Sequence, residues 1–163
     1  MKSIKNCIIK VDNIDLVPVT IEDLQFGYDL WKLTQKEFLE KINGKWNEDN
    51  EEFEMENYKD ECNTNIENNY LIKYNSSNIG WLEYKLIRKY IYIKQIHILP
   101  ECQGKRIGSN ILNEIIKYGR KNKKNILLDV LKYNDRALKF YKKLGFKIYD
   151  ENNSMFNFLE YEV

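Results

Sequence analysis

The sequence predicts an α/β or α+β fold built around a mixed, mostly antiparallel sheet, and three observations support this. Residues 69–99 contain three successive apolar segments separated by short polar turns, which is the pattern of an antiparallel meander. After residue 100 the chain alternates helical and strand periodicity, which is typical of βαβα units. The 163 residues contain no internal repeat and no Pro- or Gly-rich linker, so we expect residues 1–163 to form a single domain.

The first part of the chain predicts one strand followed by two helices. Residues 5–19 are apolar and β-branched, as in a strand. Thr20 and Asp23 have the spacing of a capping box, and apolar residues then recur at helical spacing over residues 24–42. A second, acidic helix is expected over residues 49–63, although it has fewer apolar positions.

The rest of the chain completes a sheet of six to seven strands flanked by about four helices. Asn134 is a suitable N-cap for the last helix, and Gly145 is a suitable stop for it. Asp129 is the one charged residue in an otherwise apolar strand. The expected strands span residues 69–74, 79–87, 90–99, 126–131, 146–149 and 155–161, and the expected helices span residues 107–119 and 134–144.

Composition excludes several classes of protein. No apolar stretch approaches the length of a membrane span, and the N-terminus lacks the apolar run of a signal peptide, so we expect a cytoplasmic protein without a membrane partner. Cys7, Cys62 and Cys102 are odd in number and far apart, with neither a CxxC pair nor a His cluster. This spacing predicts neither a disulfide framework nor a zinc site, and we expect no metal.

The net charge of +1 conceals a polarity along the chain. Residues 48–67 include nine acidic side chains and one Lys, whereas residues 103–147 include thirteen Lys or Arg and three acids. The basic half could bind a polyanionic ligand and the acidic run a cationic one, or both runs could be solvated helix faces, which charge alone favours. A nucleic-acid partner is disfavoured because the basic residues are not interleaved with exposed aromatic residues.

The loop over residues 100–108 leads from a strand directly into a helix and carries the clearest chemical signal. A helix N-terminus presents unpaired backbone N–H groups and positive potential. Gly104 and Gly108 permit close backbone approach, and Lys105 and Arg106 add positive charge. Together these features suit a pyrophosphate. The alternative is an ordinary strand–helix turn, since the loop is neither a Walker A sequence nor a GxGxxG fingerprint.

Two segments of this region resemble the GNAT acetyltransferase family. The first, Gln103-x-x-Arg106-x-Gly108, is similar to the (Arg/Gln)-x-x-Gly-x-(Gly/Ala) signature that clamps the pyrophosphate of acetyl-CoA, with Arg106 in place of the usual Gly. The second, Asn134-x-x-Ala137-x-x-x-Tyr141-x-x-x-Gly145-Phe146, resembles the second cofactor motif of that family. The detailed resemblance covers residues 91–148, and before residue 69 only the order of strand and helices agrees.

The resemblance implies a GNAT-like fold and an acetyl-CoA-dependent N-acetyltransferase that acts on a primary amine of a small molecule or peptide. The transfer would occur by direct attack in a ternary complex, and a homodimer is a candidate assembly. A non-catalytic acyl-CoA-binding sensor or scaffold is the alternative. The resemblance also implies a V-shaped opening between two central strands, and it assigns these residues to cofactor binding: Ile96, His97, Ile98, Gln103, Gly104, Lys105, Arg106, Ile107, Gly108, Ser109, Asn134, Ala137 and Tyr141.

The resemblance makes Tyr141 the general acid, and its alternative role is that of a core aromatic. A phenol is protonated at neutral pH and can donate to the departing CoA thiolate. The candidate bases that would take the amine proton are, in order, Asp129, His97 and Glu83, and a chain of waters is the fourth choice.

The acceptor is expected between the first two helices, the strand over residues 79–87 and the C-terminal strands. The aromatic residues considered for its lining are Trp31, Trp46, Trp81 and Tyr84, each of which could instead belong to the core. The acidic run over residues 48–67 favours a cationic acceptor.

Overall fold

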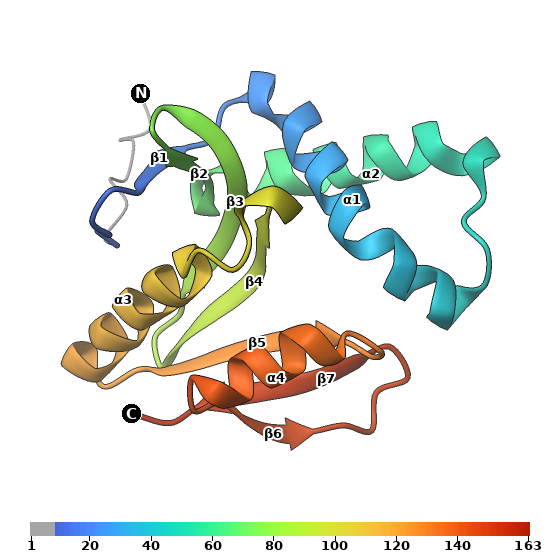
Figure 1. Ribbon diagram of the computed structural model, residues 1–163. Helices are drawn as coiled ribbons and strands as arrows, with labels where there is room; N and C mark the ends of the chain where they lie inside the picture. Colours follow the sequence, from blue (N-terminus) through green and yellow to red (C-terminus); the bar gives the residue numbers. More distant parts are fainter. Residues whose placement is uncertain (1–8) are drawn as a thin grey trace.

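A single mixed sheet of seven strands runs through the part of the chain that the computed structural model describes, residues 9–163, in the order β1-β2-β3-β4-β5-β7-β6 (Figure 1). Only the β4–β5 pair is parallel among these neighbours. The strands are β1 (Asp15–Pro18), β2 (Asn69–Tyr74), β3 (Ser77–Leu86), β4 (Tyr90–Ile98), β5 (Asn125–Leu131), β6 (Lys147–Asp150) and β7 (Phe156–Tyr161). The longer helices are α1 (Leu24–Asn43), α2 (Glu51–Thr64), α3 (Ile107–Asn122) and α4 (Asp135–Lys143). The predicted class, strand number and helix number are confirmed.

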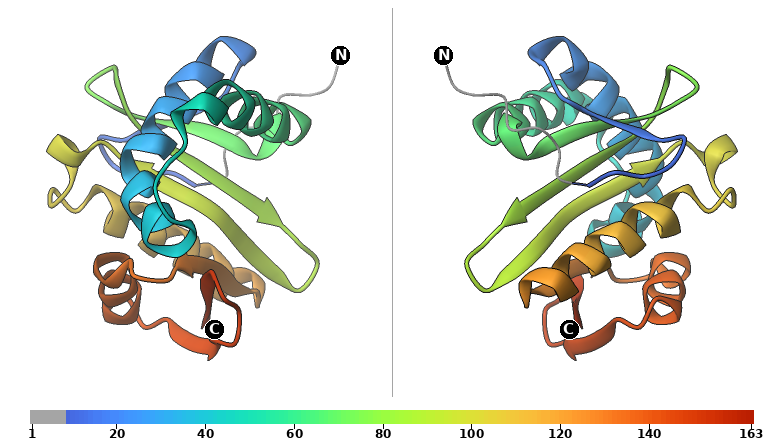
Figure 2. Two further views of the ribbon diagram at one scale, coloured as in Figure 1. Left: turned by 90° about the vertical axis from the view of Figure 1, so that its right-hand side faces the viewer. Right: turned by 90° about the vertical axis from the view of Figure 1, so that its left-hand side faces the viewer.

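The helices cover opposite faces of the sheet. Figure 2 shows α1 and α2 in front of the strands in one view and α3 in front of them in the opposite view. Successive residues of a strand point to opposite faces, so Trp81 packs in the cluster with α1 and α2, whereas Leu82 packs in the cluster with α3. On β4 and β5 the polar residues alternate with apolar ones, so the polar side chains point toward the face of the sheet that α1 and α2 cover.

The two central strands separate part-way along their length. β4 pairs with β5 only where residues 90–93 lie beside residues 125–128. Lys94 immediately follows, and it is an extra residue in the β3–β4 register, because Glu83 pairs with Gln95 but Tyr84 pairs with Ile93. Such a bulge bends its strand. Beyond it, β4 and β5 diverge to give the expected V-shaped opening (Figure 1).

The first strand is shorter than the sequence predicts. Residues 5–8 of the expected strand lie outside the described residues. Val11 and Ile14 form only an isolated bridge around a turn in which Asn13 has a φ of 62°, and β1 begins at Asp15. The apolar pattern therefore indicated burial of this segment but not its pairing, because a local turn satisfies part of its backbone.

The third helix continues past the glycine that was expected to end it. α3 ends at Asn122, where Lys123 adopts a left-handed conformation with a φ of 53°. Gly119 lies inside the helix because its missing side chain permits close packing: a Cβ there would lie 2.7 Å from the carbonyl oxygen of Lys124 and 2.8 Å from Cδ1 of Ile126. Gly119 therefore allows α3 to pack closely against the start of β5.

We predict that Gly119→Ala lowers the melting temperature, because overpacking of about 1–3 kcal/mol exceeds the gain in helix propensity of about 1 kcal/mol. Gly108→Ala in the same helix is the matched control. A Cβ at Gly108 would meet its nearest neighbours at 3.4 and 3.5 Å, which is ordinary contact. Thermal unfolding followed by circular dichroism should show a loss for the first variant and no loss for the second. Equal melting temperatures for the two variants would contradict this packing argument.

Candidate active site

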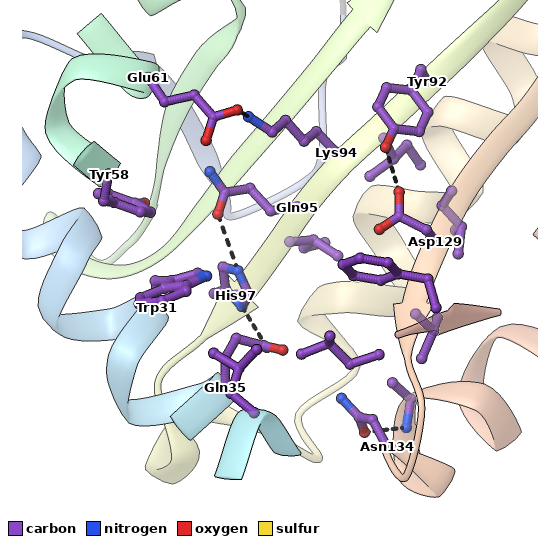
Figure 3. A pocket seen from close by; sticks show the side chains of 18 of the residues that line it. Trp31, Gln35, Tyr58, Glu61, Tyr92, Lys94, Gln95, His97, Asp129 and Asn134 are labelled. Atoms are coloured by element: carbon purple, nitrogen blue, oxygen red, sulfur yellow. Dashed lines mark hydrogen bonds and ion pairs between the residues drawn. The ribbon is translucent and has the colours of Figure 1, made fainter. Parts of the chain in front are cut away.

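A cavity of about 650 Å³ opens where β4 and β5 separate (Figure 3). Its lining comes from both faces of the sheet, which is possible only because the strands have parted. The lining residues are Trp31, Gln35 and Leu39 from α1; Glu54, Asn57, Tyr58, Glu61 and Cys62 from α2; residues 92–97 from β4; residues 128–131 from β5; and Asn134, Ala137, Tyr141, Asn153, Phe156 and Phe158 from the C-terminal part.

The loop before α3 presents unpaired N–H groups, as the sequence predicts. The first helical bond runs from the N–H of Asn110 to the carbonyl of Arg106 at 2.9 Å, so the N–H groups of Ile107, Gly108 and Ser109 have no partner within the helix. Gly104 and Lys105 are exposed beside them. These groups could hold a pyrophosphate at the positive end of the helix dipole.

Gln103 has a different position from the one that its sequence pattern suggests. Its backbone N–H donates to the carbonyl of Pro100 at 3.1 Å, so this N–H is already engaged. Its side-chain amide donates to the carbonyl of Ile98 at 2.8 Å, at the end of β4. Gln103 thus ties the loop to the strand that borders the cavity.

Arg106 explains why this position of the loop favours glycine. Its φ is 62°, in the left-handed region that costs an L-residue about 1–2 kcal/mol. The side chain is exposed, so it does not clash with the helix that follows. Arg at this position therefore adds backbone strain and a positive charge to the loop.

The edge of β4 that faces the opening carries backbone groups of Ile96 and Ile98 that have no strand partner, and of these the carbonyl of Ile98 accepts from the side chain of Gln103. The N–H of Leu99 donates to the carbonyl of Ile79 at 2.9 Å, and pairing alternates along an antiparallel ladder, so the backbone of His97 also faces β3. Ile96 and Ile98 therefore direct their backbone groups toward the split. Ile96, His97 and Ile98 are all among the residues expected to bind the cofactor, and His97 is the one whose backbone is directed away from the opening.

Asn134, which precedes α4, and Tyr141, within α4, both line the cavity. The side-chain oxygen of Asn134 accepts from the N–H of Ala137 at 3.0 Å, which is an N-cap. Tyr141 is 8% exposed and packs against Phe140 and Phe146. Burial, and to a smaller extent the charge of Asp129, raises the pKa of its hydroxyl above the usual value of about 10. This phenol is therefore protonated at neutral pH.

Asp129 lies on β5 beside the parted strand β4, and its side chain is half-buried. Burial raises the pKa of this carboxyl, while a hydrogen bond donated by the hydroxyl of Tyr92 and the nearby charge of Lys94 lower it in part. Asp129 and Tyr92 point toward each other across the opening (Figure 3). A cavity carboxylate with a raised pKa is suited to accept a proton.

The other two candidate bases have less access. His97 is 8% exposed, and burial lowers its pKa to about 4, so the ring is neutral at pH 7. Both of its ring nitrogens lie within hydrogen-bond distance of protein groups, as described below. Glu83 is 0% exposed and does not line the cavity, and burial raises its pKa.

The aromatic residues expected around the acceptor divide into two groups. Trp31 lines the cavity, but Trp46, Trp81 and Tyr84 do not, and the strand that carries the last two contributes nothing to the lining. Trp81 is fully buried and its indole N–H donates to the side chain of Asn69 at 2.8 Å, so it is a core residue. Sequence reasoning missed Tyr92 and Gln95, whose alternation with the apolar residues of β4 was the available signal.

No group of three or more His, Cys, Asp or Glu side chains that could hold a metal ion occurs among residues 9–163. Within the same residues no helix has the length and apolar content to cross a bilayer.

A model of the acetyltransferase (GNAT) family matches residues 28–146. The chain is 36% identical over 84 residues to a spermidine N(1)-acetyltransferase of Thermoplasma acidophilum, and that match covers 50% of this chain. The chain spans about half the length of this curated relative, 51%.

Two solved structures share the fold over most of both chains. The PaiA N-acetyltransferase of Thermoplasma acidophilum, in complex with coenzyme A, has a TM-score of 0.71 at 26% identity and covers 92% of this chain and 99% of its own. An acetyltransferase of Thermus thermophilus has a TM-score of 0.73 at 18% identity and covers 94% and 99%. Because the identity to the Thermus thermophilus protein is this low, the likeness to it concerns the fold alone.

We predict that Tyr92→Phe raises the pKa of the Asp129 carboxyl further, because the lost hydrogen bond stabilises the charged form. The measurement is the pH dependence of the Asp129 side-chain carbon shift by NMR. Tyr118→Phe, which removes a phenol hydroxyl from α3, is the control and should leave the titration of Asp129 unchanged. An unchanged or lower pKa in Tyr92→Phe would show that the hydrogen bond does not govern this carboxyl.

Proposed function

Because the chain belongs to the acetyltransferase (GNAT) family, we propose that it transfers the acetyl group of acetyl-CoA to a primary amine of a small molecule or peptide. The transfer occurs by direct attack in a ternary complex. One observation carries this proposal: the phenol of Tyr141 and the carboxyl of Asp129 both line the cavity at the point where the strands part. A general acid and a general base are thereby available on one side of the same opening.

The cosubstrate is proposed to lie along the loop and the open edge of β4. The free N–H groups at the start of α3, together with Lys105 and Arg106, would hold the pyrophosphate. The backbone groups of Ile96 and Ile98 would bind the pantetheine arm, whose amides need partners of this kind. The acetyl end of the cosubstrate would then lie in the cavity, which Tyr141 lines. Coenzyme A in the PaiA complex of Thermoplasma acidophilum supports the same type of ligand.

The proposed chemistry divides the proton transfers between two residues. An alkyl ammonium of pKa near 10 has no lone pair, so a base must take its proton before attack. Asp129 is assigned this role, ahead of His97 and Glu83, because it lines the cavity with a raised pKa. Attack joins the amine nitrogen to the acetyl carbon, the C–S bond breaks to release the thiolate of CoA, and the nitrogen gives up its second proton to water as the amide forms. Tyr141 then donates its proton to that thiolate.

The acceptor is proposed to be cationic. Glu54 and Glu61 of the acidic helix α2 line the cavity, and Trp31 adds an aromatic face that suits an ammonium or alkyl chain. The spermidine acetyltransferase among the relatives supports an acceptor of this class. A non-catalytic acyl-CoA-binding module is the second candidate, favoured by the strained Arg106, whereas a buried phenol in the cavity favours the enzyme.

We predict that thiol release from acetyl-CoA is stimulated by polyamines in a panel of amines, antibiotics and peptides, with acetylated products detected by mass spectrometry. Added salt should raise the KM for cationic acceptors, because it screens the acidic wall. Glu54→Gln should raise that KM by about two- to five-fold, the size of a partly screened charge pair. Glu56→Gln on the same helix is the control, because Glu56 does not line the cavity. A salt-independent KM would remove the support for a cationic acceptor.

We predict that Tyr141→Phe lowers kcat by about 10²- to 10⁴-fold with little change in the affinity for coenzyme A measured by calorimetry. Tyr74→Phe, at the end of β2 beside the turn into β3, should retain full activity. Asp129→Asn should lower kcat similarly and abolish the acidic limb of the pH profile, since activity requires the ionised carboxyl. Turnover by Tyr141→Phe at the parental rate would refute the assigned acid, and absence of any affinity for the coenzyme would refute the function itself.

A further inference from the structure

A chain of hydrogen bonds crosses the protein from β3 to α1 beside the cavity. The side-chain amide of Gln95 donates to Glu83 at 3.0 Å, and the amide oxygen of Gln95 lies 3.2 Å from Nε2 of His97. Nδ1 of His97 lies 2.9 Å from the hydroxyl of Thr34 on α1 and 3.3 Å from the side-chain amide of Gln35. Figure 3 shows Gln95, His97 and Gln35 in this order.

The direction of each bond follows from the first member of the chain. A carboxylate can only accept, so Gln95 must turn its NH₂ group toward Glu83 and its carbonyl oxygen toward His97. That oxygen can only accept, so Nε2 of His97 must carry the ring proton. Nδ1 is then an acceptor. The hydroxyl of Thr34 donates to the carbonyls of Leu30 at 2.9 Å and Trp31 at 3.2 Å, so the side-chain amide of Gln35 is the donor to Nδ1. We propose that Gln95 is a positioning residue through which the carboxylate of Glu83 fixes the ring proton of His97 on Nε2.

The same atoms can form a second chain in which every bond is reversed. If Glu83 carries a proton, it can donate to the oxygen of Gln95, whose NH₂ group then donates to Nε2 of His97. The ring proton then lies on Nδ1 and is donated to Thr34, whose hydroxyl donates to the carbonyl of Leu30 at 2.9 Å. One added proton on Glu83 thus moves the proton of His97 from one nitrogen to the other, and the bonds that link Glu83, Gln95 and His97 are all kept.

The state of Glu83 depends on the groups that surround it. Lys94 on β4 lies 3.7 Å away and also pairs with Glu61 of α2, and Lys85 on β3 adds a second positive charge. Glu61 contributes a negative charge, and the Tyr58 hydroxyl and Cys62 thiol of α2 lie on the same side. The remaining oxygen of Glu83, Oε1, has no hydrogen-bond partner among the described residues. Lys94 is thus the group that most directly holds Glu83 ionised.

The hydrogen bonds of His97 also connect two elements of the protein that line the cavity. Thr34 and Gln35 belong to α1, which supplies one wall of the cavity, while Gln95 and His97 belong to β4, which supplies another. Because both ring nitrogens of His97 are engaged, the ring joins these two walls and has no free lone pair for an amine. This inference is independent of the acceptor and of catalysis, so it can fail while the proposed function stands.

The test is ¹⁵N NMR of the imidazole ring, which is unambiguous because the chain contains one His. In the wild-type protein at neutral pH, we expect a protonated Nε2 and an unprotonated Nδ1. Glu83→Gln replaces the carboxylate with an amide that can either donate or accept, so the direction is no longer imposed. The two ring nitrogen shifts should then move toward each other as the Nδ1–H form becomes populated. Glu61→Gln, which removes the other carboxylate paired with Lys94, is the matched control and should leave both shifts unchanged.

Two results would overturn the proposal: a wild-type ring protonated on Nδ1, or a Glu83→Gln spectrum identical to that of the wild type. A pH titration of the wild-type protein gives a second measurement if Glu83→Gln does not fold. Burial raises the pKa of Glu83 and lowers that of His97 to about 4, so Glu83 takes up its proton first as the pH falls. The ring should therefore change tautomer before it becomes an imidazolium. A single transition directly to the imidazolium would contradict the coupling.

Discussion

The early end of the pairing between β4 and β5 is the constraint on which the site depends. Four residues of each strand pair, and the bulge at Lys94 then turns β4 away. A closed sheet would separate α1 and α2 from α4, and no cavity could be lined by both faces. The split also leaves the backbone of Ile96 and Ile98 without a strand partner. Backbone groups that lack a strand partner need another partner, and the side chain of Gln103 supplies one for the carbonyl of Ile98.

Burial shifts the pKa values of the titratable groups in and beside this opening, and the shifts have a common consequence. The carboxyls of Asp129 and Glu83 have raised pKa values, the imidazole of His97 has a lowered one, and the phenol of Tyr141 stays protonated. Each shift favours the neutral form of the group, as expected for removal from water. Lys94 opposes this tendency for both carboxyls. Asp129 and Tyr141, which line the opening, therefore have pKa values shifted upward, and Lys94 limits the shift of the carboxyl.

The acidic run of α2 shows how charge and geometry combine. From composition alone, a solvated helix face was the favoured interpretation. Glu54 and Glu61 line the cavity, whereas Glu52 and Glu56 face solvent, so the acidic run is not a solvated face alone. Helical periodicity decides this division: Glu54, Asn57 or Tyr58, and Glu61 follow one another at intervals of three or four positions and therefore share a face. Lys94 reaches across to Glu61 and connects this wall to β4.

The sequence by itself determined the order of strands and helices, the meander, and the loop before α3, because periodicity and turn chemistry are local properties. It also marked Gly104 and Gly108 through the chemistry of the loop, while Tyr141 was marked by the resemblance to the GNAT family. It could not indicate that Gly119 lies inside a helix, that Trp81 is core, or that Tyr92 and Gln95 reach Asp129 and Glu83, because those facts depend on which segments pack together. Only the tertiary structure decided these contacts. The physical reason is that burial and hydrogen bonding between distant segments, rather than residue type, set the charge and direction of each side chain.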